Sequence, residues 1–194
     1  RQEIIRRYYA AACAVRQGLS DAAELRKIEL IMNSAGISIE DRPVVKAALD
    51  RAEETGAPAV ALELNDGTII TGKTSSLLGA SSSLLLNALK AVAGIDQKLD
   101  LIPSSVIAPI SKLKTENLGH RNPRLHSDEV LIALAISGLT NPLAALVQQQ
   151  LGALRGCDAH FSVIISEEDR NLYKRLGIHV SCEPKYESKQ LYHK

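Results

Sequence analysis

The sequence predicts a mixed α/β protein in which a small helical bundle, residues 1–57, precedes a three-layer α/β/α domain, residues 58–194. Two observations carry this prediction. Apolar residues recur at helical spacing through the first third of the chain. After Pro58 the pattern changes to short β-branched runs that alternate with helical segments. Strands interleaved with helices are typical of a sheet covered by helices.

Three amphipathic helices are expected in the first 57 residues. The first ends at Gly18, where a C-terminal cap belongs. Ser20 caps the second helix and Gly36 closes it, because a hydroxyl suits the start of a helix and glycine its end. The third begins at Asp41 as its N-cap and runs to Gly56. Together these helices predict a small bundle.

A β-hairpin is predicted directly after Pro58. The apolar run AVALEL, residues 59–64, is followed by Asn-Asp-Gly and then by the β-branched run TIIT, residues 68–71. A long helix is expected next, from about Thr74 to Val92. The remaining predicted elements are helices in 106–119, 127–138, 142–154 and 167–177, the first capped by Ser104 or Ser105 and the last by Ser166, and strands in 159–166 and 178–182.

Composition excludes several classes of function. The 194 residues are 45% hydrophobic and 3% aromatic, with 23 basic and 22 acidic side chains. No basic stripe for nucleic acid or anionic membranes is present. The longest apolar run, VLIALAISGL, is shorter than the roughly 20 residues that span a bilayer. Three scattered cysteines are typical of a reducing cytoplasm. The chain begins inside a predicted helix, so we expect it to be part of a longer cytoplasmic protein.

The segment GTIITGKTSS, residues 67–76, matches G-x-x-x-x-G-K-[ST], the signature of a loop that wraps phosphates. In such a loop four residues curl so that their N–H groups face the phosphate. Here these four are Thr-Ile-Ile-Thr, whose branched side chains favour an extended chain. We therefore predict a strand that runs into a helix, and no P-loop NTPase.

The second half of the same motif is a candidate anion site. A helix start near Thr74 would bring together Lys73, the hydroxyls of Thr74, Ser75 and Ser76, and backbone N–H groups without helical partners. The alternative is that a hydroxyl side chain only caps the helix. Both interpretations stay open on the sequence.

A second polar concentration is LGHRNPRLHSDE, residues 118–129. Arg121 and Arg124 can each hold a carboxylate or a phosphate through the guanidinium fork. His126 can move protons near neutral pH, and Asp128 lies beside it. The alternative is a solvated loop whose side chains cap the next helix.

A metal site is not expected. Cys157, His160, His179 and Cys182 are potential zinc ligands. In a strand, however, His179 and Cys182 are three residues apart and point to opposite faces. The zincin pattern H-E-x-x-H is absent, and so is the G-x-S-x-G elbow. No cofactor is indicated by any motif.

Several longer motifs resemble the C-terminal part of the bacterial domain-of-unknown-function family 1846: RQEIIRRYY, GKTSSLLGASSSLLLNALK, NPRLHSDEVLIAL, LRGCDAH, CEPKY and LYHK. The resemblance covers essentially the whole chain. It implies a cytoplasmic bacterial protein that self-associates and whose N-terminal half carries its own Gly-rich segment. It also implies an α/β domain with cytidine-deaminase-like topology. Some members of the family have been labelled ATP-dependent zinc proteases, and nothing in this chain supports that label.

Deaminase chemistry does not follow from that topology. Zinc deaminases need H-x-E or C-x-E and a later P-C-x-x-C to hold the metal. Neither pattern occurs here.

Two hypotheses of function remain. The favoured one is a non-catalytic ligand-binding and oligomerisation module that completes a site with the missing N-terminal half. The alternative is an enzyme acting on a phosphorylated or carboxylated small molecule, held by residues 73–76 and the 120–128 loop. The enzyme hypothesis requires both segments to share one cleft.

Overall fold

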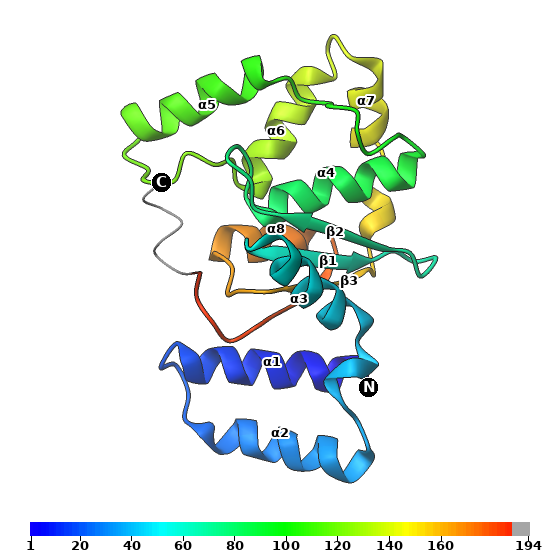
Figure 1. The fold of residues 1–194 in the computed structure, drawn as a ribbon, viewed down its shortest axis with the longest axis vertical. Coiled ribbons are helices and arrows are strands. Elements are labelled where there is room, and N and C mark those ends of the chain that lie inside the picture. The colour runs from blue at the N-terminus through cyan, green and yellow to red at the C-terminus, as the bar shows by residue number, and fades with distance from the viewer. Residues whose placement is uncertain (188–194) are drawn as a thin grey trace.

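The computed structural model describes residues 1–187 as a mixed α/β fold, with helices on both faces of a four-stranded sheet (Figure 1). The helices are α1 (Gln2–Arg16), α2 (Ala22–Ala35), the short η1 (Ile39–Asp41), α3 (Pro43–Thr55), α4 (Ala80–Ala93), α5 (Ser104–Glu116), α6 (Ser127–Ser137), α7 (Pro142–Gln148), the short η2 (Leu151–Leu154) and α8 (Glu167–Arg175). The strands are β1 (Ala59–Glu63), β2 (Ile69–Lys73), β3 (Asp158–Phe161) and β4 (His179–Cys182).

The predicted hairpin is confirmed. β1 and β2 pair antiparallel, with Ala59 opposite Lys73 and Glu63 opposite Ile69. Gly67 has a φ of 85°, a conformation that glycine adopts without steric cost. The Asp66 side chain accepts a hydrogen bond of 2.9 Å from the Thr68 N–H. The turn chemistry of Asn-Asp-Gly therefore sets the register of the hairpin.

The sheet has the strand order β2-β1-β3-β4. β1 is antiparallel to β3, whereas β3 and β4 are parallel and are joined through α8. Parallel neighbours need a crossover of this kind, because a tight turn cannot return the chain to the same end of the sheet. This connection places the start of α8 at one edge of the structure, beside the ends of the hairpin.

The two faces of the sheet are covered by different helices, with α4 above it and α3 below it in Figure 1. Alternate residues of β1 face opposite sides: Val60 and Leu62 belong to the large core with α4, and Ala61 contacts α3. α3 therefore packs directly on the sheet. Its Val45 also joins the small core between α1 and α2, so the first three helices share their packing with the sheet.

Three predicted helix starts are wrong. α4 begins at Ala80 and not at Thr74, because residues 74–79 form a loop that pairs with a distant segment. The N-cap of α2 is Asp21, whose carboxylate accepts a hydrogen bond of 2.8 Å from the Ala23 N–H, and not Ser20. α3 begins at Pro43. Asp41, the predicted cap, instead lies in η1 and accepts a hydrogen bond from the backbone of Ser38.

Candidate functional site

The glycines of the phosphate-loop motif have structural roles in the hairpin. Gly67 makes the turn, and Ile69–Lys73 is strand β2, so the prediction of an extended chain is confirmed. Gly72 lies against α4, where a Cβ atom would come within 2.5 Å of the Leu84 backbone nitrogen. Glycine is therefore required at position 72 because the helix backbone crosses the strand there.

The two segments that the enzyme hypothesis requires to meet do lie against each other. Leu78 and Leu125 form a parallel bridge, and the Leu125 N–H donates to the Leu77 carbonyl over 3.0 Å. The Arg124 Nε donates to the carbonyl of Ser75. The Ser75 hydroxyl accepts from the backbone of Leu78 over 3.1 Å, which shapes the loop from inside.

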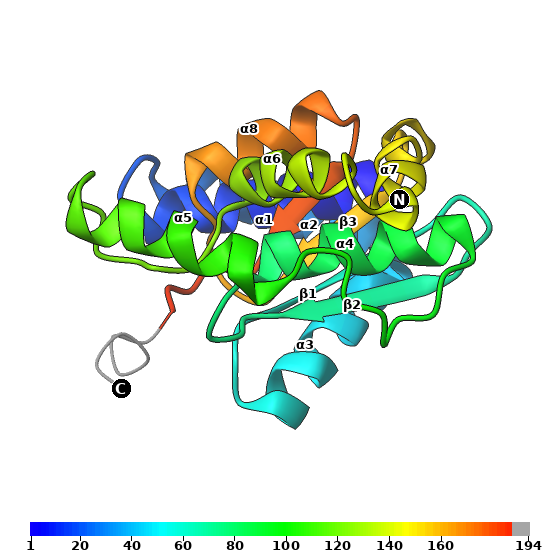
Figure 2. The same ribbon diagram turned by 90° about the horizontal axis from the view of Figure 1, so that it is seen from above.

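A cavity of about 160 Å³ opens where these segments meet the start of α8. α4, α6 and α8 lie side by side (Figure 2), and residues from the N-terminal end of each line the cavity. Its polar lining consists of Thr74, Ser81, Asn122, Arg124, His126, Ser166, Asp169 and Glu187. A helix start presents backbone N–H groups and the positive end of the helix dipole, so three such ends favour negative charge at this place.

Asp169 is a negative charge already held at this junction. Its side chain accepts hydrogen bonds from the Ser81 hydroxyl over 2.7 Å and from the hydroxyl and the backbone N–H of Ser127. Asp169 is 9% exposed, and its own N–H donates to the Ser166 hydroxyl. Tyr173, also on α8, donates from its hydroxyl to the Ser81 carbonyl over 2.7 Å. These contacts join α4, α6 and α8 at their first turns.

The predicted site residues divide into two groups. Thr74, Arg124 and His126 line the cavity. The others do not line it: Lys73 ends β2, Ser75 bonds within its own loop, and Ser76, Arg121 and Asp128 are exposed. The Asp128 carboxylate caps the first turn of α6, where it accepts from the Glu129 N–H over 2.9 Å. The expectation that Asp128 lies near the chemistry is therefore not met in this geometry.

Arg124 and the start of α4 are the groups left for a ligand. Only the Nε of Arg124 has a hydrogen-bond partner among the described residues, so its two terminal nitrogens are unused. The N-cap of α4 is Gly79, which has no side chain to accept from the first N–H groups of the helix. Lys114 holds the Arg124 loop in place by donating to the Arg124 carbonyl over 2.6 Å and to Glu129 over 2.7 Å.

A second polar cluster, which the sequence analysis did not identify, surrounds Arg42 below the sheet. Arg42 is 0% exposed, and all five of its N–H donors have acceptors: Ser181, Gln2, Asp158, and the carbonyls of Ala159 and His179. These partners come from α1, β3 and β4. A buried guanidinium needs such complete pairing, because an unmet donor in the interior costs free energy. Arg42 therefore ties the N-terminal helices to the sheet.

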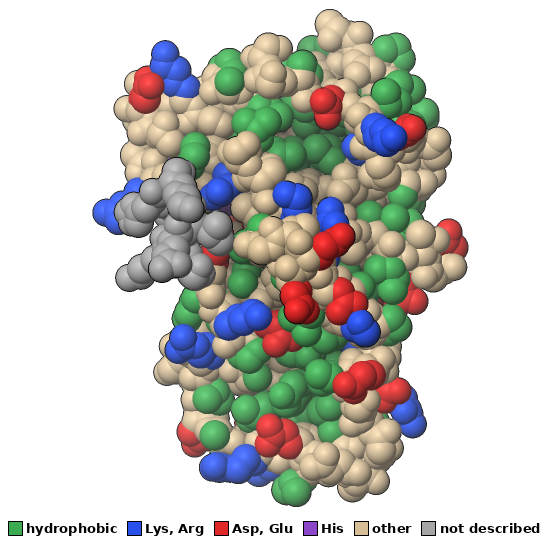
Figure 3. Space-filling view, viewed as in Figure 1, with side chains coloured by type: hydrophobic (Ala, Val, Ile, Leu, Met, Phe, Trp, Pro, Cys, Tyr) green, Lys and Arg blue, Asp and Glu red, His purple; other side chains and the backbone are tan. Residues whose placement is uncertain are grey.

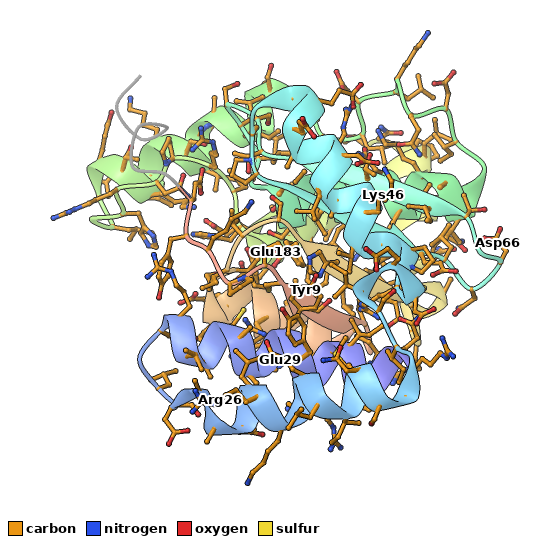
Figure 4. The ribbon with its side chains drawn as sticks, turned by 60° about the horizontal axis from the view of Figure 1, so that its bottom comes forward. Tyr9, Arg26, Glu29, Lys46, Asp66 and Glu183 are labelled. Atoms are coloured by element: carbon orange, nitrogen blue, oxygen red, sulfur yellow. The ribbon has the colours of Figure 1, made fainter. Side chains whose placement is uncertain are left out.

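His160 lies next to this cluster. It is 0% exposed, and its ring bonds to the Ser181 hydroxyl over 2.8 Å and to Glu183 over 3.0 Å. Burial lowers the pKa of His160, and this effect exceeds the opposing effect of Glu183. Burial alone would raise the pKa of Glu183, but hydrogen bonds from His160 and Tyr9 bring it below its usual value. Figure 4 shows Tyr9 of α1 beside Glu183.

The four potential zinc ligands occupy different surroundings. In the parallel pairing of β3 and β4, His160 lies opposite Ser181 and Phe161 opposite Cys182. His179 is exposed, whereas Cys157 and Cys182 are buried and free. Across residues 1–187 no group of three or more His, Cys, Asp or Glu side chains has the arrangement of a metal site. Within the same residues, no helix combines the length and the apolar character needed to cross a bilayer.

Comparison with known proteins confirms the resemblance seen in the motifs. The family model "Domain of unknown function DUF1846, C-terminal" matches residues 40–192. The chain is 50% identical to a UPF0371 protein of Corynebacterium glutamicum, 51% to one of Corynebacterium efficiens and 48% to one of Streptococcus thermophilus, over all 194 residues. In each case it spans 39% of the relative's length.

Proposed function

The chain belongs to the DUF1846 family, and from that premise we propose that it is a ligand-binding and assembly module of a longer protein. Its ligand is a small molecule with a phosphate or carboxylate group. The ligand binds in the cavity between the starts of α4, α6 and α8 and contacts the rest of the protein at the same time. Family membership follows from the sequence, and the binding site is added here from the structure.

The observation that supports it best is the meeting of residues 74–79 with the Arg124 loop at one cavity. Among residues 1–187 the two terminal nitrogens of Arg124 have no hydrogen-bond partner, and a guanidinium binds the oxygens of a phosphate or carboxylate through parallel hydrogen bonds. The uncapped start of α4 lies on the same cavity and adds backbone donors. Asp169 already satisfies the start of α6, so the anion belongs on the α4 and Arg124 side.

Binding is favoured over catalysis because the acid groups at the cavity are engaged. The Asp169 carboxylate accepts three hydrogen bonds, Glu187 also has a partner, and Asp128 lies outside the cavity. His126 is the one predicted proton carrier that lines it. The enzyme hypothesis therefore depends on His126, with the substrate anion held by Arg124.

The topology is consistent with a cytidine-deaminase-like domain that has lost, or never had, the metal chemistry. The hairpin and α4 are followed, after α5, α6, α7 and η2, by the strand-helix-strand unit β3-α8-β4, and the strand order is β2-β1-β3-β4. In deaminases the H-x-E motif that binds zinc belongs to the helix after the hairpin. Here that helix is α4, which starts Ala-Ser-Ser-Ser at the cavity. An organic anion replaces the metal in this proposal.

The assembly role rests on the outer face of α6 and α7. α6 is apolar on all sides, and a helix of that kind is normally buried all round. Hydrophobic side chains gather at the upper end of the molecule, where these helices lie (Figure 3). The exposed large hydrophobic residues of α6, α7 and the turn between them are Ile132, Ile136, Leu139, Leu143 and Leu146. Since relatives are about 2.5 times as long as this chain, we propose that their remaining part packs here.

The test uses two arginines of the same loop. Full-length protein is screened by thermal shift against phosphorylated and carboxylated metabolites, and the best ligand is titrated calorimetrically into Arg124→Gln and Arg121→Gln. Arg121 is exposed and outside the cavity, so it is the matched control. We expect at least tenfold weaker binding for Arg124→Gln, about 1.4 kcal/mol or more, and no change for Arg121→Gln. Equal affinities in the two variants would contradict the proposal.

His126→Gln separates the two hypotheses. If the protein is a binding module, this variant retains the ligand and no turnover is found in either protein. If the wild-type protein converts the ligand and His126→Gln binds it without converting it, the enzyme hypothesis replaces the favoured one.

A further inference from the structure

A second cavity, of about 130 Å³, lies between α1, the start of α8 and β4. Its lining residues are all different from those of the first cavity. α8 separates the two: Ser166 and Asp169 face the first, whereas Glu167 and Arg170 face the second. The second cavity therefore needs its own explanation.

Two arginines from distant parts of the chain line this cavity, and neither is fully paired. The Nε of Arg6 is buried and has no hydrogen-bond partner within the described residues 1–187. The terminal nitrogens of Arg6 contact Glu3 and, at 4.0 Å, Asp158. Arg170 has only long contacts, 3.6 Å to Glu167 and 3.8 Å to the Cys182 sulfur. A buried donor without an acceptor is destabilising, so an added acceptor in the cavity would be stabilising.

The other lining groups do not oppose an anion. Burial raises the pKa of the Cys13 thiol to about 11 and also raises the pKa of Cys182, so both thiols are neutral near pH 7. Ser181 also lines the cavity, but its hydroxyl is engaged by Arg42 and His160 and is not counted as a ligand group. Glu167 is the one carboxylate among the lining residues, and its side chain is 75% exposed, so solvent screens its charge.

We propose that this cavity binds one phosphate group between the guanidinium groups of Arg6 and Arg170. Its volume corresponds to roughly four water molecules at about 30 Å³ each, which suits a single phosphate group. Arginine is suited to this role because its planar fork matches two phosphate oxygens. The bound group would connect α1 to α8 and so tie the N-terminal helices to the wall that both cavities share. The phosphate belongs either to inorganic phosphate or to a small phosphorylated compound.

The first experiment measures affinity in the full-length protein. Inorganic phosphate and glycerol phosphate are titrated at constant ionic strength, with chloride as the control salt, into wild type, Arg6→Gln, Arg170→Gln and Arg26→Gln. Arg26, exposed on α2, is the matched control. We expect at least a tenfold loss of affinity in the first two variants and none in Arg26→Gln. The tighter of the two titrants in wild type identifies the source of the phosphate.

The second experiment locates the ligand without relying on a substitution. Cys13 and Cys182 line the cavity, whereas Cys157 does not. All three thiols are buried, so alkylation requires opening of the fold. Saturating phosphate should slow alkylation of Cys13 and Cys182, read by mass spectrometry, severalfold more than that of Cys157. Arg6→Lys, which keeps the charge but loses the fork, should lose most of the protection. If phosphate protects none of the three thiols, or if both glutamine variants bind like wild type, the proposal is wrong.

Discussion

Replacement of Gly72 by alanine tests whether the phosphate-loop motif serves packing or nucleotide binding. A Cβ atom at this position would lie 2.5 Å from the Leu84 nitrogen, 2.8 Å from its Cα and 3.0 Å from its Cβ. Carbon atoms in contact prefer about 3.5–4.0 Å, so α4 has to move away from β2 by roughly 1 Å. The obstacle is helix backbone, which cannot turn aside as a flexible side chain can.

The cost of this change follows from known overpacking effects. Forcing extra volume into a packed core costs about 1–3 kcal/mol, and the backbone contact places Gly72→Ala near the upper end. Alanine also reduces the entropy of the unfolded chain, which offsets about 0.4–1 kcal/mol. We expect a net loss of about 2 kcal/mol in the free energy of unfolding. With a urea dependence of about 2 kcal/mol per M, the midpoint falls by roughly 1 M.

Equilibrium urea unfolding, followed by circular dichroism, measures this difference. Gly152→Ala is the control, because a Cβ atom there has no neighbour within 4 Å and Gly152 does not have a positive φ. Its stability should stay within about 0.5 kcal/mol of wild type. The packing argument is refuted if Gly72→Ala is as stable as Gly152→Ala. If that stable variant also loses affinity for a nucleotide, the motif is a phosphate loop after all.

Three further predictions concern the buried polar clusters. Arg42→Ala should lower the free energy of unfolding by about 3 kcal/mol, because it leaves Asp158 without its buried partner. Arg26→Ala, at an exposed position, should change the free energy of unfolding little, and urea unfolding measures both variants. The pKa of His160 is lowered in the folded state, so as the pH falls the unfolded chain takes up a proton at His160 before the folded chain does. Stability should therefore be complete above about pH 6.5 and fall as the pH drops below that value, and His160→Gln should flatten this dependence between pH 5 and 6.5 in thermal melts. Asp169→Ala should lower the free energy of unfolding by about 2 kcal/mol, because it removes the acceptor shared by the first turns of α4 and α6. A melting temperature equal to that of wild type would show that these hydrogen bonds make no net contribution to stability.

Local signals in the sequence were sufficient for elements whose geometry depends on neighbouring residues. The Asn-Asp-Gly turn and the β-branched runs predict the hairpin, and Gly36, Gly56 and Gly94 end their helices in the left-handed conformation that glycine favours. The pattern S-x-x-D at Ser166 likewise predicts the start of α8. Asp169 is the last residue of this pattern, so the pattern also places an acidic side chain in the first turn of α8.

Long-range contacts decided the rest. α4 starts late because Leu78 pairs with Leu125, 47 residues away in the chain. The buried carboxylate at the cavity is Asp169 and not the predicted Asp128. The crossover from β3 to β4 through α8 places the first turn of α8 beside the starts of α4 and α6.

The sequence by itself determined the family, the class of fold, the hairpin and three of the residues that line the cavity. Only the tertiary structure decided which charges are buried together, with Arg42 reaching β3 and β4 across more than 100 positions in the chain. The physical reason is that backbone preferences act within a few residues. The pairing of a buried charge, in contrast, depends on groups that only folding brings within hydrogen-bonding distance.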